Sequence, residues 1–279
     1  MTETPERQET APHDGPPGRP YPHRHPHRVL TWRTAANSAG YLLPHLHEGL
    51  SVLDVGCGPG TVTIDLARRV APGAVVGVDG ADENVVQAAG LAFDQSVRNV
   101  RFRVAEPTAL PLPDASVDVV HAHQVLHQLA DPVAALGEMR RVLRPGGILA
   151  ARDADYGAVA WYPRLAGLAD WLGAYRAVHA STNGSTEAGR ALKAWARRAG
   201  FDTVTSSASI WCFASSAERE WWGRSWADRV VEADFAAQAI ETGVARLADL
   251  QRIGDAWRQW AADEDGWFAL PHGEIIAVR

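Results

Sequence analysis

Short apolar runs alternate with helix-like segments through the first half of the chain. Five of these runs have the content of strands, and they span residues 51–55, 74–79, 100–105, 117–122 and 148–152. After the first run, apolar residues recur every fourth position over 61–70, as on one face of a helix. Strands that alternate with helices pack as a parallel sheet, so this half predicts an α/β fold.

The pattern changes after residue 157, where the chain becomes largely helical and strongly aromatic. Helical spacing covers 158–200 and 214–268, with a sixth strand within 201–213 and a last strand at 273–279. At the other end, 29–47 is predicted to be helical. Residues 1–28 are rich in Pro, Gly, His and charge, which predicts a disordered tail followed by one domain over 29–279.

A glycine turn follows the first predicted strand directly. Gly56, Gly58 and Gly60 come after Asp54, at the strand end where open α/β sheets bind ligands. The spacing differs from the G-x-G-x-x-G of dinucleotide sites, and no Gly-Lys-Ser or Gly-Lys-Thr follows. Asp79 ends the second strand and follows Gly60 by 19 residues, about the separation at which an acid meets a ribose.

Four stretches, taken in order, resemble class I S-adenosylmethionine-dependent methyltransferases, above all the quinone-biosynthesis and small-molecule branch of the methyltransferase type 11 kind. They are the loop with Asp54 and Gly56, Val76–Asp79, Leu110–Asp114 with Val117–Val120, and Leu143–Gly147. The resemblance covers about 29–153. It implies a Rossmann-like, seven-stranded, mostly parallel sheet with helices on both faces and a helical cap inserted near the C-terminus.

The resemblance also implies the cofactor, S-adenosylmethionine, and the residues that bind it. These are Asp54, Gly56, Cys57, Gly58, Asp79, Gly80, Glu106, Pro107 and Ala122. Two of these positions depart from the family pattern. Glu106 stands where Asp is usual, and Pro107 has no N–H to offer to the adenine ring. The cofactor-binding half is then 29–157, and 158–200 and 214–268 are expected to cover the substrate.

Composition narrows the setting. The 279 residues carry a net charge of −6, which gives no electrostatic argument for nucleic-acid binding. No apolar run is long enough to span a membrane, and 1–28 lacks the apolar centre of a secretory signal. The only cysteines are Cys57 and Cys212, which suits a reducing cytoplasm.

No resident metal is expected. Asp153 and Asp155 end the fifth strand, but Ala122 and His123 stand where a catechol-type magnesium site needs a further acid. The His-rich stretch at 23–27 is better explained as a solvated tail.

Methyl transfer needs a general base only if the acceptor carries a weakly acidic proton. His123 and His127 follow the fourth strand, where the family places the sulfonium, and are the catalytic candidates, with a hydrogen-bonding wall as the alternative role. Of the 11 tryptophans, most must pack in the core, but Trp32, Trp161, Trp211 and Trp222 are candidates for an apolar substrate pocket.

The expected function is methylation of a small aromatic or apolar metabolite. One alternative is methylation of a quinone ring carbon. Another is a non-catalytic cofactor-binding or regulatory protein on the same fold. A nicotinamide oxidoreductase is disfavoured by the glycine spacing. The expected partner is a small-molecule methyl acceptor, without nucleic acid and without stable membrane insertion.

Overall fold

A computed structural model describes residues 32–181, 184–232 and 234–279 of the chain. The predicted tail at 1–28, with its histidines, lies outside the described residues. The first half alternates strands and helices as expected. Its elements are β1 (Val52–Val55), α3 (Thr61–Val70), β2 (Val75–Asp79), α4 (Asp82–Asp94), β3 (Val100–Val104), β4 (Val117–His123), η2 (Leu126–Gln128), α5 (Pro132–Val142) and β5 (Leu143–Ala154).

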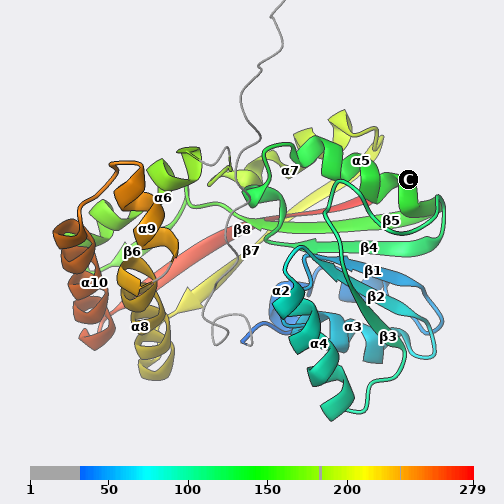
Figure 1. Ribbon diagram of the computed structural model, residues 1–279, viewed down its shortest axis with the longest axis horizontal. Helices are drawn as coiled ribbons and strands as arrows, with labels where there is room; N and C mark the ends of the chain where they lie inside the picture. The colour runs from blue at the N-terminus through cyan, green and yellow to red at the C-terminus, as the bar shows by residue number, and fades with distance from the viewer. Residues whose placement is uncertain (1–31, 182–183, 233) are drawn as a thin grey trace, which may run out of the picture.

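These five strands form a parallel array in the order β3-β2-β1-β4-β5, with helices on both faces (Figure 1). The strands at the centre of the sheet are buried. All four residues of β1 and nearly all of β4 are buried, because their side chains are either apolar or hydrogen-bonded within the protein. The Rossmann-like fold predicted from the sequence is confirmed. The order β2-β1-β4 places the ends of these three strands, and therefore Asp54, Asp79 and His123, along one edge of the sheet.

The second half extends the same sheet. It consists of β6 (Ala160–Tyr162), α6 (Ala166–Ser181), α7 (Ala188–Arg198), β7 (Thr203–Phe213), α8 (Ser216–Glu232), α9 (Asp234–Glu241), α10 (Leu247–Ala262) and β8 (Trp267–Val278). The strand β8 is antiparallel to β5, β6 and β7. The described sheet therefore has eight strands rather than the seven predicted, and β8 begins six residues before the predicted 273.

The extra strand is β6, a three-residue segment inside the aromatic stretch that we expected to be helical or irregular. It pairs with Trp267–Ala269 of β8, beyond the point where β5 stops pairing at His272. A segment this short has no alternation to detect. Only the long partner strand, which continues past the end of β5, creates a place for it.

The helix predicted over 29–47 is wrong in extent. Within the described residues it consists of the single turn α2 (Ala35–Ser38) and the 3₁₀ turn η1 (Leu43–His45). Thr34 caps α2 by accepting from the backbone N–H of Asn37, and Pro44 removes a backbone donor that a continuous helix would use. Leu42 and Leu46 are nevertheless buried. The apolar residues of this segment therefore indicate burial, although their spacing does not indicate a continuous helix.

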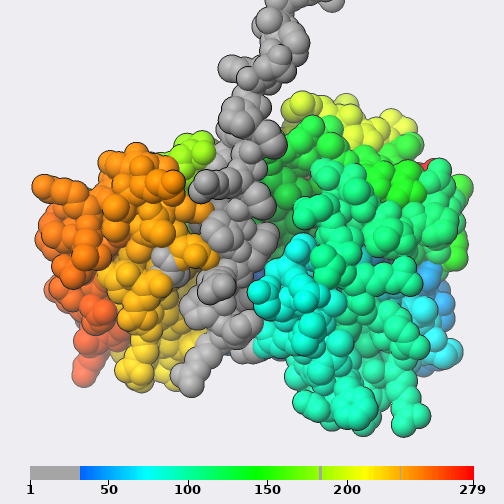
Figure 2. Space-filling view, in the orientation of Figure 1, coloured from blue at the N-terminus to red at the C-terminus, as the bar shows by residue number. Residues whose placement is uncertain are grey.

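The molecule has two lobes, and β7 and β8 run through both of them (Figure 1). The sheet lobe holds α2 to α5 and α7. The helical lobe holds α6, α8, α9 and α10, which appear in green, yellow and orange at the left of Figures 1 and 2. Residues 188–198, expected to belong to a substrate cover, form α7, which lies against β5 and β8 of the sheet lobe.

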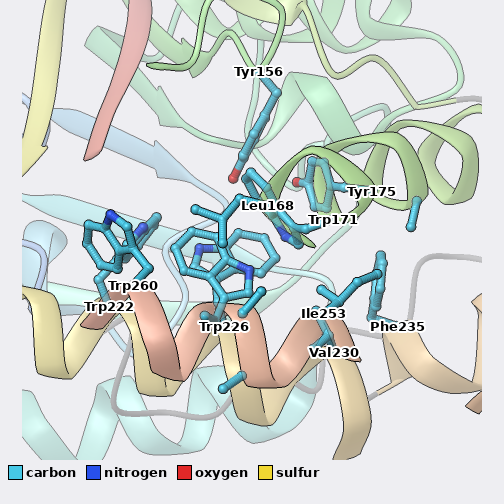
Figure 3. Close-up of a cluster of buried hydrophobic side chains, with 14 of the residues drawn as sticks. Tyr156, Leu168, Trp171, Tyr175, Trp222, Trp226, Val230, Phe235, Ile253 and Trp260 are labelled. Atoms are coloured by element: carbon cyan, nitrogen blue, oxygen red, sulfur yellow. The ribbon is translucent and has the colours of Figure 1, made fainter. Parts of the chain in front are cut away.

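An aromatic core holds the helical lobe together. Trp171 of α6 lies 4.7 Å from Trp226 of α8 and 4.9 Å from Trp257 of α10, measured between ring centroids. Phe268 of β8 lies 5.3 Å from Trp257 and ties this core to the sheet. Figure 3 shows the side chains of α6, α8 and α10 converging on the same interior. Most of the late tryptophans are therefore packing residues, as burial of so much aromatic surface requires.

The described part of the chain contains no helix with both the length and the apolarity that crossing a membrane would require.

Two glycines allow α7 to approach the sheet. A Cβ on Gly189 would lie 2.6 Å from the carbonyl oxygen of Asp153 and 2.7 Å from the backbone nitrogen of Gly273. A Cβ on Gly273 would overlap the Gly189 carbonyl. Backbone meets backbone here, so neither position can be relieved by rotation of a side chain.

We therefore predict that Gly273→Ala lowers the free energy of unfolding by about 1–3 kcal/mol, the usual cost of overpacking. The matched control is Gly90→Ala in α4, where a Cβ meets nothing within 4 Å. That change should raise the free energy of unfolding by about 0.5–1 kcal/mol through helix propensity. Urea titration of both variants measures the difference, and a stable Gly273→Ala protein would contradict the close packing.

Candidate functional site

A cavity of about 1570 Å³, open to solvent, lies at the carboxyl ends of β1, β2 and β4 and continues between the two lobes. One half is lined by the loops of the sheet lobe, and the other by side chains of the helical lobe and of β7.

The glycine loop at the floor of the cavity uses its own backbone donors. The N–H groups of Gly56 and Cys57 donate to the Val78 carbonyl at 2.8 and 3.0 Å, and Gly60 donates to Cys57. Gly58 donates to the Asp79 carboxylate at 2.8 Å. These four N–H groups are therefore not free to bind a phosphate.

Gly56 also needs to be glycine for its conformation. Its φ is +70°, and a Cβ there would overlap the Val125 side chain. The loop is thereby held close to the end of β4.

The Asp79 carboxylate joins the loop to the next helix. One oxygen accepts from Gly58, and the other accepts from the Ala81 N–H and from Asn84 Nδ2, each at 3.0 Å. A carboxylate has about four acceptor positions, so one remains for a ligand hydroxyl. The sequence motifs did not indicate Asn84, whose only signal is its place in the first turn of α4.

Asp54 forms a buried hydrogen-bonded set with two residues that sequence reasoning missed. Its oxygens meet His121 Nδ1 at 2.7 Å and Thr63 Oγ1 at 2.5 Å. Because a carboxylate accepts, His121 donates from Nδ1 and keeps an acceptor lone pair on Nε2, which has no partner within the described structure. His121 lines the cavity, and its place beside Asp54 follows from the β1–β4 register.

The other residues predicted to bind the cofactor divide into two groups. Gly80, Glu106 and Pro107 line the cavity, and Glu106 Oε1 lies close to Gly80. Ala122 does not line it with its side chain, because it is buried in β4 between Val55 and Ala151.

His123 is buried in the cavity wall. Its ring lies 6.0 Å from that of His272 and 5.4 Å from that of Trp211, and neither ring nitrogen has a partner among the described residues. Burial, and then the charges of Arg33 and Arg152, hold the pKa of His123 well below its usual value. The ring is therefore neutral, and accepting a proton there is unfavourable.

His127 has different surroundings. Its Nδ1 lies 2.6 Å from Asp153 Oδ1, and Asp153 Oδ2 accepts from the backbone N–H groups of Leu126 and His127. The His127 ring lines the cavity and stacks 6.1 Å from His179. The carboxylate fixes the tautomer with the proton on Nδ1, so Nε2 is the acceptor.

The acids that could have held a metal are thus engaged elsewhere. Asp155 accepts from both Nε and Nη2 of Arg190, at 2.6 and 2.8 Å. Within 32–181, 184–232 and 234–279, no group of three or more His, Cys, Asp or Glu side chains is arranged to hold a metal ion.

Tryptophans form the wall between the lobes. Trp32 lies 4.9 Å from Trp211 and 5.3 Å from Trp221, and Trp211 donates from Nε1 to the Asn37 carbonyl. Three of the tryptophans predicted for a substrate pocket, Trp32, Trp211 and Trp222, line the cavity, together with Trp221 and Trp226, which the sequence did not single out. Trp161 lies outside the lining and packs 6.5 Å from Phe268.

The cavity also contains polar residues without a sequence motif. Arg33 donates to Gln124 Oε1, and Gln124 Nε2 donates to His272 Nε2 at 2.8 Å. Gln124 has a φ of +54°, which turns its side chain into the cavity after β4 ends. Arg229 of α8 lines the opposite side. Long-range pairings of this kind leave no local pattern in the sequence.

Comparisons with known proteins agree with this geometry. The methyltransferase domain family matches residues 46–200, more than half of the chain. An uncharacterized methyltransferase of Schizosaccharomyces pombe is 33% identical over 254 residues, which cover 88% of this chain and 90% of that protein. The probable methyltransferase ltbC of Aspergillus luteorubrus is 32% identical over 269 residues, covering 88% of this chain and 92% of that protein.

Among solved structures, the YcgJ protein of Bacillus subtilis has a TM-score of 0.58 to this chain at 21% identity. The match covers 87% of this chain and 98% of that one. At this identity the likeness supports the fold.

The buried histidines predict an acid-sensitive fold. The pKa of His179 is lowered to about 3 by burial and then by His127, and burial holds the pKa of His272 well below its usual value, as for His123. In the unfolded chain all three return to about 6.5, so below that pH the unfolded state binds more protons. The free energy of unfolding therefore decreases as the pH is lowered below about 6.5, by up to about 1.4 kcal/mol per pH unit for each group.

Thermal melting from about pH 7 to about pH 5 should show this loss. His179→Leu should make the slope shallower, whereas His47→Gln, at an exposed position, should not change it. A melting temperature that is unchanged or higher at the lower pH would contradict the prediction.

A second prediction concerns Asp79. Asp79→Ala removes the acceptor of Gly58, Ala81 and Asn84 and the position left for a ligand hydroxyl. We expect S-adenosylhomocysteine to bind more weakly by about 1.5–3 kcal/mol, the value of a hydrogen bond to a charged group. Asp82→Ala, three residues on and exposed, is the control. Calorimetry compares them, and equal affinities would remove Asp79 from the ligand site.

Proposed function

Because this chain belongs to the S-adenosylmethionine-dependent methyltransferases, we propose that it methylates a hydroxyl group of a small aromatic molecule, with His127 as the general base. The family supplies the activity and the cofactor. The acceptor, the methylated atom and the role of each residue are our proposal. The observation that carries it is the His127–Asp153 pair, which faces an aromatic cavity beside the glycine loop.

The half of the cavity around the glycine loop, here called the donor half because it would hold the methyl donor, suits the proposed cofactor. Asp79 has one acceptor position for a ribose hydroxyl, and His121 Nε2 can accept from a ligand ammonium group. Carboxylates line this half, with no guanidinium among its described residues, so it favours a cation over a phosphate. When bound, S-adenosylmethionine supplies an electrophilic methyl group on a sulfonium.

His127 would take the proton of the acceptor hydroxyl on Nε2. Asp153 would stabilise the resulting imidazolium through the 2.6 Å contact with Nδ1. The acceptor oxygen, made more nucleophilic, would then bond to the methyl carbon that S-adenosylmethionine supplies, and the electron pair of the broken carbon–sulfur bond would stay on sulfur as a neutral thioether.

His123 is the weaker candidate for the base. A base must gain a positive charge, and His123 is buried beside two arginines that oppose this charge. We assign it to the neutral wall of the site, with Trp211 against its ring. Its role would be to exclude water and to present a hydrogen-bonding nitrogen to the acceptor.

The tryptophan wall suits a flat acceptor. Trp32, Trp211 and Trp221 meet from three separate segments and enclose the cavity between the lobes. Their rings offer broad apolar area with few polar atoms, which favours an aromatic ring. We propose that residues 158–181 and 214–268 provide the acceptor side of the site, while 32–157 provide the donor side.

Methylation of a quinone ring carbon is the alternative. A carbon nucleophile that is already activated as a phenolate would depend less on a base than a neutral hydroxyl would. To decide between the two, the enzyme is incubated with methyl-labelled cofactor and a panel of catechols, phenols and a reduced short-chain quinone. The labelled products are then identified by nuclear magnetic resonance. Label on oxygen supports the proposal, and label on ring carbon supports the alternative.

Two variants test the base. His127→Ala should lower kcat/KM for the best phenolic acceptor by about 10²–10⁴-fold near neutral pH, the usual contribution of a general base. The loss should shrink at high pH, where the acceptor ionises without help. His45→Ala, an exposed histidine of η1, is the control.

Asp153→Asn tests the positioning of His127. An Asn oxygen can still accept from the Leu126 and His127 N–H groups, but its NH₂ would face Nδ1 and force the proton onto Nε2. Activity should fall while S-adenosylhomocysteine affinity and melting temperature stay near wild type. Full activity in both variants would mean that no base acts at this position.

A further inference from the structure

The two halves of the cavity differ in charge. All three carboxylates that line it, Asp54, Asp79 and Glu106, belong to the half around the glycine loop. The half between the lobes is lined by aromatic, histidine and amide side chains and by two guanidinium groups, those of Arg33 and Arg229. Among the described lining residues, this half has no carboxylate.

Arg33 is the better defined of the two. It lies just before α2, donates to Gln124 Oε1 at the end of β4, and has its guanidinium 5.7 Å from the centre of the Trp211 ring. No carboxylate of the described residues lies within 4 Å of its nitrogens. Burial lowers the pKa of Arg33 to about 10, and Arg152 acts in the same direction. A desolvated cation is thus held at the cavity wall without an anion in direct contact.

Arg152, by contrast, shows how this protein compensates a buried cation elsewhere. Its guanidinium also lies over Trp211, at 4.8 Å, but it pairs with Glu274 at 3.2 Å. Ser207 and Ser209 in turn donate to that carboxylate. Arg152 therefore has its counter-ion inside the protein, whereas Arg33 faces the cavity with an amide as its hydrogen-bond partner.

Arg229 reaches the same space from α8. Its guanidinium lies 4.7 Å from the ring centre of Trp226 and 5.8 Å from that of Tyr175. Its charge contributes to the lowered pKa of Arg33, so the two cations act on one region of the cavity. An anion placed between the lobes would be attracted by both.

We infer that the acceptor carries a carboxylate as well as its hydroxyl, and that Arg33 binds this carboxylate with help from the charge of Arg229. The inference rests on the proposed function for the hydroxyl and names the chemical class of the acceptor, an aromatic hydroxy acid. A guanidinium presents a planar pair of donors that matches the two oxygens of a carboxylate. The tryptophan wall holds the ring, and His127 lies in the same cavity to receive the hydroxyl proton.

The test compares two ligands of nearly the same shape, protocatechuic acid and its primary amide, by calorimetry on the full chain with S-adenosylhomocysteine present. Wild type should bind the acid about tenfold or more tightly than the amide, because a hydrogen bond to a charged group is lost in the amide. Arg33→Gln should bring the two affinities to within about twofold, and Arg229→Gln should reduce the difference in part. Arg224→Gln, exposed on α8, is the matched control and should keep the wild-type preference.

Equal affinities in wild type, or no binding of either ligand at millimolar concentration, would overturn the inference. A preference that survives in both Arg33→Gln and Arg229→Gln would also overturn it, since the anion would then be bound elsewhere. The proposed function is judged separately, by methyl transfer to the same two ligands. Methylation of both ligands without a preference for the acid would contradict only the carboxylate, whereas selective binding of the acid without any methylated product would contradict only the base-assisted transfer.

Discussion

The whole arrangement depends on the pairing of one strand. β8 is hydrogen-bonded to β5 in the sheet lobe, to β6 in the helical lobe and to β7 along nearly its full length. This continuous ladder fixes the distance between the glycine loop and the tryptophan wall, because both lobes pack on the same backbone. His272 and Leu270 of β8 lie at the centre of this span and touch the cavity network. A cavity between two separately tethered domains would change shape as they moved, and here a sheet spans the gap.

The ionisable side chains of the site differ in how deeply they are buried and in which groups they contact. Asp54 and Asp79 are buried and accept from backbone or side-chain donors, so their positions around the glycine loop are fixed, and Asp79 keeps one acceptor position for a ligand. His123 and His272 are kept neutral by burial and by neighbouring arginines. His121 and His127 both line the cavity and each has a carboxylate on Nδ1, but His121 lies beside Asp54 of β1 whereas His127 lies beside Asp153 and next to His179 of α6. Environment, more than residue type, distinguishes these imidazoles.

The sequence predicted the part of the structure that local pattern encodes. The strands before β6, the glycine loop and the position of Asp79 at the end of β2 follow from periodicity, turn residues and spacing. The single-turn α2 and the strand β6 could not be predicted, since each depends on a distant partner: Ala35 of α2 donates to Asp65 of α3, and Ala160–Tyr162 pair with β8. The His127–Asp153 pair joins positions 26 residues apart, and Arg33 meets Gln124 across 91. Neither pairing has a spacing rule, because only the folded sheet brings them together.

The completed hydrogen bonds of the glycine loop have a consequence for turnover. Because the N–H groups of Gly56, Cys57, Gly58 and Gly60 are satisfied before any ligand arrives, the loop needs no ordering when one binds. A preorganised loop binds the parts that substrate and product have in common with the same strength before and after the reaction, which is uniform binding and adds nothing to the rate. The two forms of the cofactor also differ in charge, because the sulfonium becomes a neutral thioether. Discrimination between them, and with it the release of product, must then come from this lost charge and from the other lobe.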